Sequence, residues 1–417
     1  MGSHRPNPWW VGVVAGMASY IDAAAIVANG IALVIYQETI GVTPGQIGVL
    51  SAALTFCIAI GALSGGRLGD RFGRRRVFLA TMALIVAGSA LLTFSTVFPL
   101  LFAGIVLVGL GVGADLPVSL ATIAESASGQ NRGAILGLSN ILWSVGILSA
   151  IVISSVAGGW GRLGGQLLYA QVGVVALVLL VLRLGIPESD SWLRAGDERR
   201  GGVHTVRADK VSIRDLIQPP YGRPLLALLL FYALTNLAAN TAGQFNTYIA
   251  ANIAGVEVEV FNRVALLAFP VGLLAGVWFM RVVDTPRRMP YFAAGAVLLV
   301  IGYLVPAVLG FTLTTMGAGV VLTGIGGAFA FEGIMKVWTQ ESFPTMLRSS
   351  AQGTIVAFAR ITAALLALVT PALLDAGARA FYLVLALLVA VGLLIGWREF
   401  HGHTHDEFTR EAERAGT

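Results

Sequence analysis

The stretch Gly65 to Arg76, which reads GGRLGDRFGRRR, is short, strongly charged and flanked by two long apolar runs. It holds five arginines and a single acid, Asp70, within twelve residues. Its glycines Gly66, Gly69 and Gly73 predict a tight turn in which backbone segments approach closely. We therefore expect a charged loop between two apolar helices. In the simplest interpretation its arginines only set the orientation of those helices.

The composition is that of a membrane protein. Of the 417 residues, 56% are hydrophobic and 12% are charged, whereas about 25% are charged in a soluble domain. The mean hydropathy of +0.81 agrees. The net charge of +5 comes mainly from arginines in short loops, so we expect no nucleic-acid partner. The one cysteine, Cys57, lies in an apolar run and predicts no internal disulfide. The first apolar run is too long for a cleavable signal peptide.

The apolar runs predict an all-α membrane protein with twelve transmembrane helices. The expected spans are 10–36, 46–66, 76–95, 98–124, 133–157, 166–186, 223–250, 262–283, 290–310, 312–339, 350–374 and 378–397. They predict an N-terminal six-helix bundle (1–186), a cytoplasmic linker (187–222), a C-terminal six-helix bundle (223–397) and a cytoplasmic tail (398–417).

The basic residues predict the orientation of these spans. Arginines cluster at 67–76, at 281–288 and in the linker, whereas the loops on the opposite side hold only Arg162, Arg263 and Arg379. Because positive residues favour the inner side, we expect a multi-pass protein of the cell membrane with both termini in the cytoplasm.

The two predicted bundles repeat one another. Glu125 and Arg132 are separated by six residues, as are Glu341 and Arg348, and both pairs are related by an offset of 216 residues. Such parallel repeats are typical of transporters whose halves are related by an axis along the membrane normal.

The spacing Gly66-x-Leu68-x-Asp70-Arg71-x-Gly73-Arg74-Arg75 resembles the signature loop between helices 2 and 3 of the major facilitator superfamily. The resemblance implies two pseudo-symmetric six-helix bundles that work by alternating access. It also implies a cytoplasmic gate, to which we assign the charged loop and the repeated pairs. These residues are Gly66, Asp70, Arg71, Gly73, Arg74, Arg75, Glu125, Arg132, Glu341 and Arg348.

Further motifs resemble the sugar-porter branch of that family. They are the Glu125–Arg132 pair with the following Gly133, and the run Pro187-Glu188-Ser189 after the sixth span. Two features depart from the branch. Ile105 occupies the position of its helix 4 arginine, and amides on span 223–250 replace its double glutamine. These departures favour the related organic-ion and aromatic-acid metabolite carriers.

Four ionisable residues fall near the middle of predicted spans, namely Asp22, Asp115, Glu332 and Arg360. Each costs roughly 2.5–3.5 kcal/mol at that depth unless it is paired or faces water. The three acids are our candidates for proton coupling. The resemblance implies that role for Asp22, and Asp115 and Glu332 are candidates because they lie at a similar depth. Arg360 can pair with Asp22 or clamp a substrate carboxylate.

Two interpretations of these charges stay open. Glu332 and Lys336 stand one helical turn apart, so they can form a purely structural pair. Asp115 has no evident partner in the sequence, which makes it either a second proton site or a contact for a cation. Internal salt bridges that only fix the helices would explain all four residues without a transport role.

The sequence therefore predicts a proton-coupled secondary transporter of a small polar organic solute, such as an organic acid or a sugar. The alternative is a proton-driven exporter of drugs or organic cations, and a channel or receptor forms a third class. We find no nucleophile–base set, metal spacing or nucleotide loop, so we expect neither an enzyme nor a cofactor. We expect a monomer in the lipid bilayer. The candidate substrate-binding residues are Tyr20, Asn29, Asn140, Trp143, Asn236, Asn240, Gln244, Phe331 and Arg360.

Overall fold

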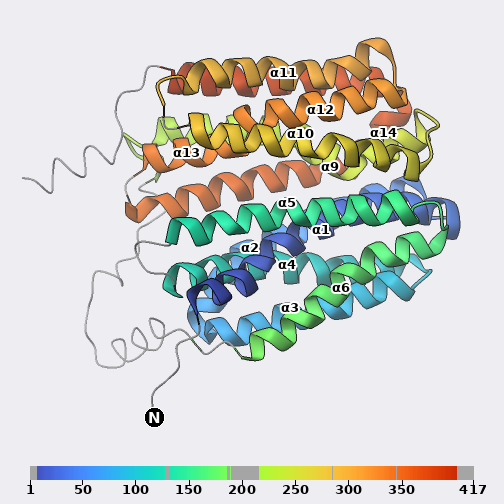
Figure 1. Cartoon of the computed structure of the whole chain (residues 1–417), viewed down its shortest axis with the longest axis horizontal. Coiled ribbons are helices and arrows are strands. Elements are labelled where there is room, and N and C mark those ends of the chain that lie inside the picture. Colours follow the sequence, from blue (N-terminus) through green and yellow to red (C-terminus); the bar gives the residue numbers. More distant parts are fainter. Residues whose placement is uncertain are drawn as a thin grey trace, which may run out of the picture. The chain divides into compact units, whose positions relative to one another are not determined.

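The computed structural model of the chain describes residues 7–126, 132–185, 188, 216–283, 285–343 and 345–401. Long helices dominate these ranges, and they form two compact units, Met1–Asp209 and Lys210–Thr417. The first unit holds α1 (Pro8–Ile40), α2 (Pro44–Phe72), α3 (Arg74–Phe94), α4 (Phe98–Ser126), α5 (Arg132–Ala157) and α6 (Arg162–Leu184). The second holds α9 (Gly222–Asn252), α10 (Val258–Val282), α11 (Arg288–Leu309), α12 (Leu313–Ala330), α13 (Glu332–Ser342) and α14 (Thr345–Phe400) (Figure 1).

The helices of the described ranges account for twelve membrane spans. Ten stretches are long and apolar enough to cross a membrane, with α12 and α13 forming one stretch and most of α14 another. Non-helical backbone at Gly377 divides α14 into two helices, and the shorter apolar stretch Ile141–Ala157 of α5 completes the set. The predicted all-α fold with twelve spans is confirmed, because the thickness of the hydrocarbon layer fixes how long an apolar run must be.

Local sequence signals set several of the helix ends. Thr43 begins α2 with a capping box, in which Gln46 N donates to Thr43 Oγ1 at 3.3 Å and Thr43 N donates to Gln46 Oε1 at 2.9 Å. Pro44 follows as the first helical residue, where its missing N–H costs nothing. Gly41 ends α1 in the left-handed conformation that glycine tolerates best.

The charged loop differs from the sequence expectation. Helix α2 continues to Phe72, so the expected turn over Gly66, Gly69 and Gly73 contracts to Gly73 alone. Gly73 has φ of +94°, a conformation that other residues rarely adopt. The expectation failed because glycines inside a membrane helix serve close helix packing rather than turning.

Small residues bring α2 and α4 into backbone contact. A Cβ atom on Gly65 would lie 2.4 Å from the carbonyl oxygen of Ala114, and one on Gly113 would lie 2.1 Å from that of Ile58. We call this contact the glycine seam. It continues at Gly69, whose added Cβ would lie 3.1 Å from Val118 Cγ2.

Each unit buries one set of helix faces and leaves others apolar and exposed. In the first unit α1 packs on α4, α5 and α6, and in the second α9 packs on α14. Large apolar side chains stay exposed on α6 and α10, for example Val174, Val181, Leu267 and Leu274. Lipid tails are as apolar as leucine, so such faces suit a bilayer.

Candidate functional site

Asp22 lies in the interior of the first unit. Its side chain is 2% exposed, and Tyr20, two residues earlier on α1, is 8% exposed. Helix α5 crosses α1 at this point without a side chain between them, because a Cβ on Gly146 would lie 2.3 Å from Tyr20 O and 3.1 Å from Ala23 Cβ. The environment of Asp22 is therefore shaped by direct contact between α1 and α5.

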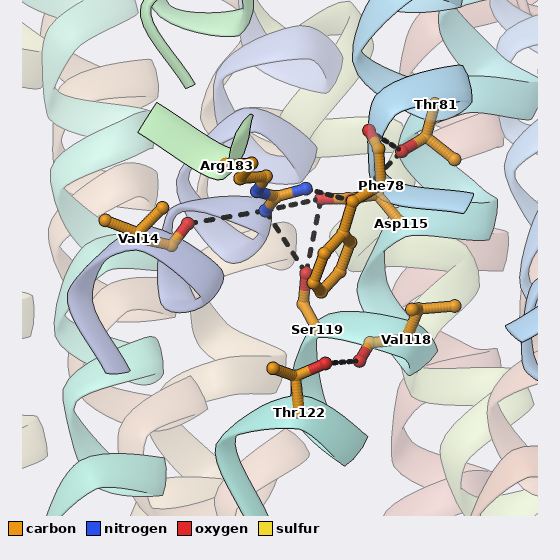
Figure 2. A network of polar contacts seen from close by, with 8 residues as sticks. All are labelled: Val14, Phe78, Thr81, Asp115, Val118, Ser119, Thr122 and Arg183. Carbon is orange, nitrogen blue, oxygen red and sulfur yellow. Dashed lines mark hydrogen bonds and ion pairs between the residues drawn. The ribbon is translucent and has the colours of Figure 1, made fainter. Parts of the chain in front are cut away.

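Asp115 of α4 forms a buried ion pair with Arg183 of α6 (Figure 2). The guanidinium approaches both carboxylate oxygens, through Nη1 to Oδ1 and through Nη2 to Oδ2 at 3.0 Å. The two side chains are 1% and 0% exposed. Thr81 Oγ1 donates to Asp115 Oδ1 at 3.1 Å, and Ser119 Oγ lies 3.4 Å from Oδ2. This fork-to-fork geometry is the strong form of a charged hydrogen bond.

The guanidinium of Arg183 also reaches two further helices. Its Nη2 donates to Ser119 Oγ at 3.2 Å and to the carbonyl oxygen of Val14 on α1 at 3.4 Å. Its Cζ lies 4.4 Å from the ring centroid of Phe78 on α3, a cation–π contact. One arginine therefore joins α1, α3, α4 and α6, and we call these contacts the Arg183 network.

The Arg183 network corrects the expectation that Asp115 lacks a partner. Arg183 was missed in the sequence although a signal was present, since it is a lone basic residue inside the predicted span 166–186. A charged residue in a span marks a candidate site together with its partner. The interpretation of Asp115 as a contact for a cation loses support, because an arginine already occupies its carboxylate.

Asn29 points into the first unit. It is 0% exposed, and Tyr169 OH of α6 donates to its Oδ1 at 2.9 Å. The two side chains line a cavity of about 10 Å³ together with residues of α2, α3 and α4, among them Ser89 and Ile105. These surroundings favour an internal role for Asn29 over direct contact with a solute.

The second unit contains a break inside a membrane span. Helix α12 ends at Ala330, Phe331 has non-helical backbone (φ −131°, ψ −119°), and α13 begins at Glu332. Glu332 Oε1 lies 2.8 Å from Lys336 Nζ, so the pairing of these residues is confirmed. Interrupted spans of this kind mark binding sites in transporters, because free helix ends and unwound backbone offer polar groups there.

Other side chains of the second unit gather around Glu332. Tyr232 of α9 hydrogen-bonds its carboxylate, and the charge of Arg360 on α14 acts on the same group. The ring of Tyr232 stacks on Phe331 with the centroids 5.4 Å apart. Arg360 thus shares its surroundings with Glu332 inside one unit, whereas the proposed partners of Arg360 were Asp22 and a substrate carboxylate.

Amide side chains continue this polar region along α9. Asn236, Asn240 and Gln244 follow Tyr232 at intervals of four residues. Residues four apart are neighbours on a helix surface, so these side chains lie on successive turns of α9. Gln244 Nε2 donates to Asn240 Oδ1 at 3.1 Å, and Asn236 Nδ2 lies 3.4 Å from the carbonyl oxygen of Ala359. We call Tyr232, the three amides, Phe331, Glu332, Lys336 and Arg360 the polar cluster.

The candidate substrate residues are divided between the two units. Asn236, Asn240, Gln244, Phe331 and Arg360 belong to the polar cluster of the second unit, whereas Tyr20, Asn29 and Trp143 belong to the first. Trp143 lies on α5 and is 38% exposed.

Glu188 holds the start of α3. Its carboxylate accepts from the backbone N–H of Arg74 at 2.7 Å and of Arg75 at 3.3 Å. A Cβ on Gly73 would lie 2.3 Å from Glu188 Oε2, but that side-chain end can move, so it is the positive φ of Gly73 that favours glycine in this turn. Arg75 Nη2 in turn donates to the carbonyl oxygen of Leu184 at 3.0 Å. The carboxylate satisfies amide donors that every helix start leaves open.

Glu341 joins α13 to α11. Its Oε1 lies 2.5 Å from Arg288 Nη1, and both side chains are partly exposed. The partner of Glu341 therefore comes from a neighbouring helix.

Some predicted residues lie outside the described side chains. Their backbone falls in α2 (Gly66, Asp70, Arg71), α4 (Glu125), α5 (Arg132, Asn140) and α14 (Arg348). The predicted gate role of these residues, and of the described Gly73, Arg74, Arg75 and Glu341, stays a prediction.

Comparison with known proteins agrees with the geometry. The sequence profile of the Major Facilitator Superfamily matches residues 9–330. The chain is 32% identical over 390 residues to the minor myo-inositol transporter IolF of Bacillus subtilis, covering 92% of this chain and 89% of that protein. It is 27% identical to the inner membrane metabolite transport protein YgcS of Escherichia coli, covering 91% and 88%.

Solved structures share the fold. A crystal structure of a D-xylose–proton symporter matches with a TM-score of 0.75 and 17% identity, covering 93% of this chain and 96% of that one. The inward-open xylose transporter XylE of E. coli matches with a TM-score of 0.75 and 18% identity, covering 95% and 98%. The expected resemblance is confirmed: the chain belongs to the Major Facilitator Superfamily and is a secondary transporter of small solutes, not an enzyme.

Proposed function

We propose that the chain is a proton-coupled transporter of a small hydroxyl-rich solute, and that a cyclic polyol of the myo-inositol type is its substrate. The observation that carries the proposal is the polar cluster at the broken span of the second unit. It offers amide, hydroxyl and charged groups within one part of the fold. The relative with 32% identity is a myo-inositol transporter.

The chemistry of the cluster suits hydroxyl groups. Each hydroxyl both donates and accepts a hydrogen bond, and so do the amides of Asn236, Asn240 and Gln244. A ring with several hydroxyls can satisfy many such groups at once. A site built to bond hydroxyl groups rejects analogues that lack them, since its polar groups would otherwise stay unmatched.

The balance of charge within the spans supports a neutral solute over an organic cation. The sequence suggested an excess of acids near the middle of the spans. In the structure Asp115 is paired with Arg183 and Glu332 with Lys336, and Arg360 acts on Glu332 as well. Three acids, counting Asp22, then stand with three bases among these described residues.

We assign the coupling proton to Asp22. It is buried in α1 at the place where the sugar-porter resemblance implies a coupling carboxylate. Asp115 is fixed by four helices in the Arg183 network, which favours a structural role. We further propose a monomer in the cell membrane. The distribution of arginines between its loops supports an orientation with both termini in the cytoplasm.

The test uses purified protein in liposomes with and without an imposed pH gradient. Wild type should accumulate radiolabelled myo-inositol only with the gradient and should exchange it without one. Asp22→Asn should lose accumulation and keep exchange. Glu259→Gln, which removes an acid from the exposed start of α10, is the matched control and should behave as wild type. Accumulation by Asp22→Asn under the gradient would move the proton site elsewhere.

The substrate class is tested by competition in the exchange assay. Unlabelled polyols should compete best, D-xylose more weakly, and nicotinate and a quaternary amine least. Asn240→Ala should raise the half-saturating polyol concentration at least tenfold, because it removes an amide of the cluster. Stronger competition by the amine would favour the exporter of organic cations instead.

A further inference from the structure

A pocket lies where α10 ends and α11 begins. Its volume is about 390 Å³, and its walls include Trp278, Arg281, Arg287 and Tyr291. The volume is within the usual range for sites that hold small molecules. The pocket belongs to the second unit alone and shares no residue with the polar cluster, so it is a separate feature of the fold.

The described residues of this pocket carry positive charge. Arg281 and Arg287 are both exposed, and none of the described residues lining the pocket is acidic. The neighbouring Arg288 forms an ion pair with Glu341. Among the described residues none forms an ion pair with Arg281 or Arg287. Two guanidinium forks in one pocket suit the oxygens of a phosphate group.

The apolar surroundings place the pocket at the edge of a membrane span. Helix α10 is one of the apolar spans, and its last three turns expose Leu274 (69%), Trp278 (55%) and Met280 (66%). The rings of Trp278 and Tyr291 lie 5.9 Å apart, one on each side of the turn. Tryptophan and tyrosine concentrate at the height of lipid headgroups.

We propose that this pocket binds an anionic phospholipid. The phosphate of the headgroup lies between Arg281 and Arg287, the two aromatic rings flank the glycerol region, and an acyl chain follows the exposed apolar face of α10. Basic pockets at the cytoplasmic ends of spanning helices are suited to such headgroups. The apolar face beside the arginines favours a lipid over free inorganic phosphate, which would gain nothing from it.

The experiment measures lipid binding to the purified full chain in detergent by native mass spectrometry. Phosphatidylglycerol should bind at least tenfold more tightly than phosphatidylcholine. Arg281→Gln and Arg287→Gln should each weaken the binding about fivefold, since each surface arginine near an anionic headgroup contributes about that factor. Trp278→Ala should weaken binding of phosphatidylglycerol as well, because it removes the flanking ring.

The matched control is the double variant Arg263→Gln, Arg379→Gln, which removes the same charge from exposed positions elsewhere in the second unit. It should bind phosphatidylglycerol as wild type does. Equal loss in this control and in Arg281→Gln, Arg287→Gln would reduce the effect to net charge and overturn the proposal. Equal binding of both lipids by wild type would also overturn it.

Two further arms distinguish the source of the anion and the effect on folding. Millimolar inorganic phosphate should not displace the lipid, and displacement would show a free phosphate site instead. Arg281→Lys, Arg287→Lys keeps the charge but loses the forks, so it should bind with intermediate affinity. If this conservative variant binds as weakly as the glutamine variant while its unfolding temperature matches wild type, charge attraction is excluded as the basis of the site.

Discussion

Removing Arg183 should destabilise the first unit strongly. Arg183→Met leaves the Asp115 carboxylate in the interior, where its remaining hydrogen-bond partners among the described residues are the hydroxyls of Thr81 and Ser119. The two charged side chains are 0% and 1% exposed, so water cannot replace the lost partner. Breaking such a buried pair from one side costs about 3–5 kcal/mol. We expect Arg183→Met to lower the free energy of unfolding by that amount.

The double variant separates the pair from its surroundings. Asp115→Leu, Arg183→Met removes both charges and fills the space with apolar atoms, which is often neutral or stabilising for a buried pair. We expect it to regain most of the stability lost in Arg183→Met, to within about 1 kcal/mol of wild type. A pair on the surface provides the control. Glu259 and Arg263 on α10 are 21% and 61% exposed, and Arg263→Met should cost about 0.5 kcal/mol or less.

The assay follows the loss of helical signal as SDS is added to the protein in mixed micelles. Wild type, Asp115→Leu, Arg183→Met and the double variant are all measured under one condition. The reasoning is refuted if Arg183→Met costs as little as Arg263→Met. It is also refuted if the double variant loses as much as the two single variants together. If Arg183→Met stays stable but loses proton-driven uptake, Asp115 is a proton site, as the sequence first suggested.

Three other predictions concern single positions. Gly146→Ala should cost about 1–3 kcal/mol of unfolding free energy, because the new methyl group meets Tyr20 O at 2.3 Å; the control Gly276→Ala, in open space on α10, should be neutral or stabilising, and equal losses would disprove the contact. Glu188→Ala should cost about 0.5–2 kcal/mol by uncapping α3, and Glu188→Gln less; no loss in thermal unfolding would show that the cap is dispensable. Lys336→Met should change stability by less than about 1 kcal/mol yet weaken polyol binding tenfold or more, and unchanged binding would place the partly exposed pair outside the site.

The sequence predicted the spans well because their length is a property of the bilayer and not of any particular contact. The run 98–124, for example, corresponds to α4 over Phe98–Ser126. The charged loop was predicted less well. The local sequence around its glycines predicts a turn. The contact with α4, which the local sequence does not contain, shows that Gly65 and Gly69 serve helix packing.

In the candidate site, too, local sequence predicts some features, whereas others depend on contacts between helices. The Glu332–Lys336 pair could be predicted because helical geometry alone brings residues four apart together. The Asp115–Arg183 pair joins positions 68 residues apart and depends on how α4 meets α6, which no local pattern encodes. No proline near Phe331 predicts the break in the helix. Its role in a candidate site follows only from the side chains that gather around Glu332.

The glycine seam between α2 and α4 also limits how this chain can diverge. Gly65 and Gly113 each touch the opposite backbone, so no smaller residue on the partner helix can compensate for an added methyl group. Packed residues usually change together, with a larger residue on one helix compensated by a smaller one on its partner. Such compensating substitutions are therefore not possible at these two positions. Substitutions can accumulate on the lipid-facing sides of both helices, while the facing strips remain glycine for as long as the two backbones stay in contact.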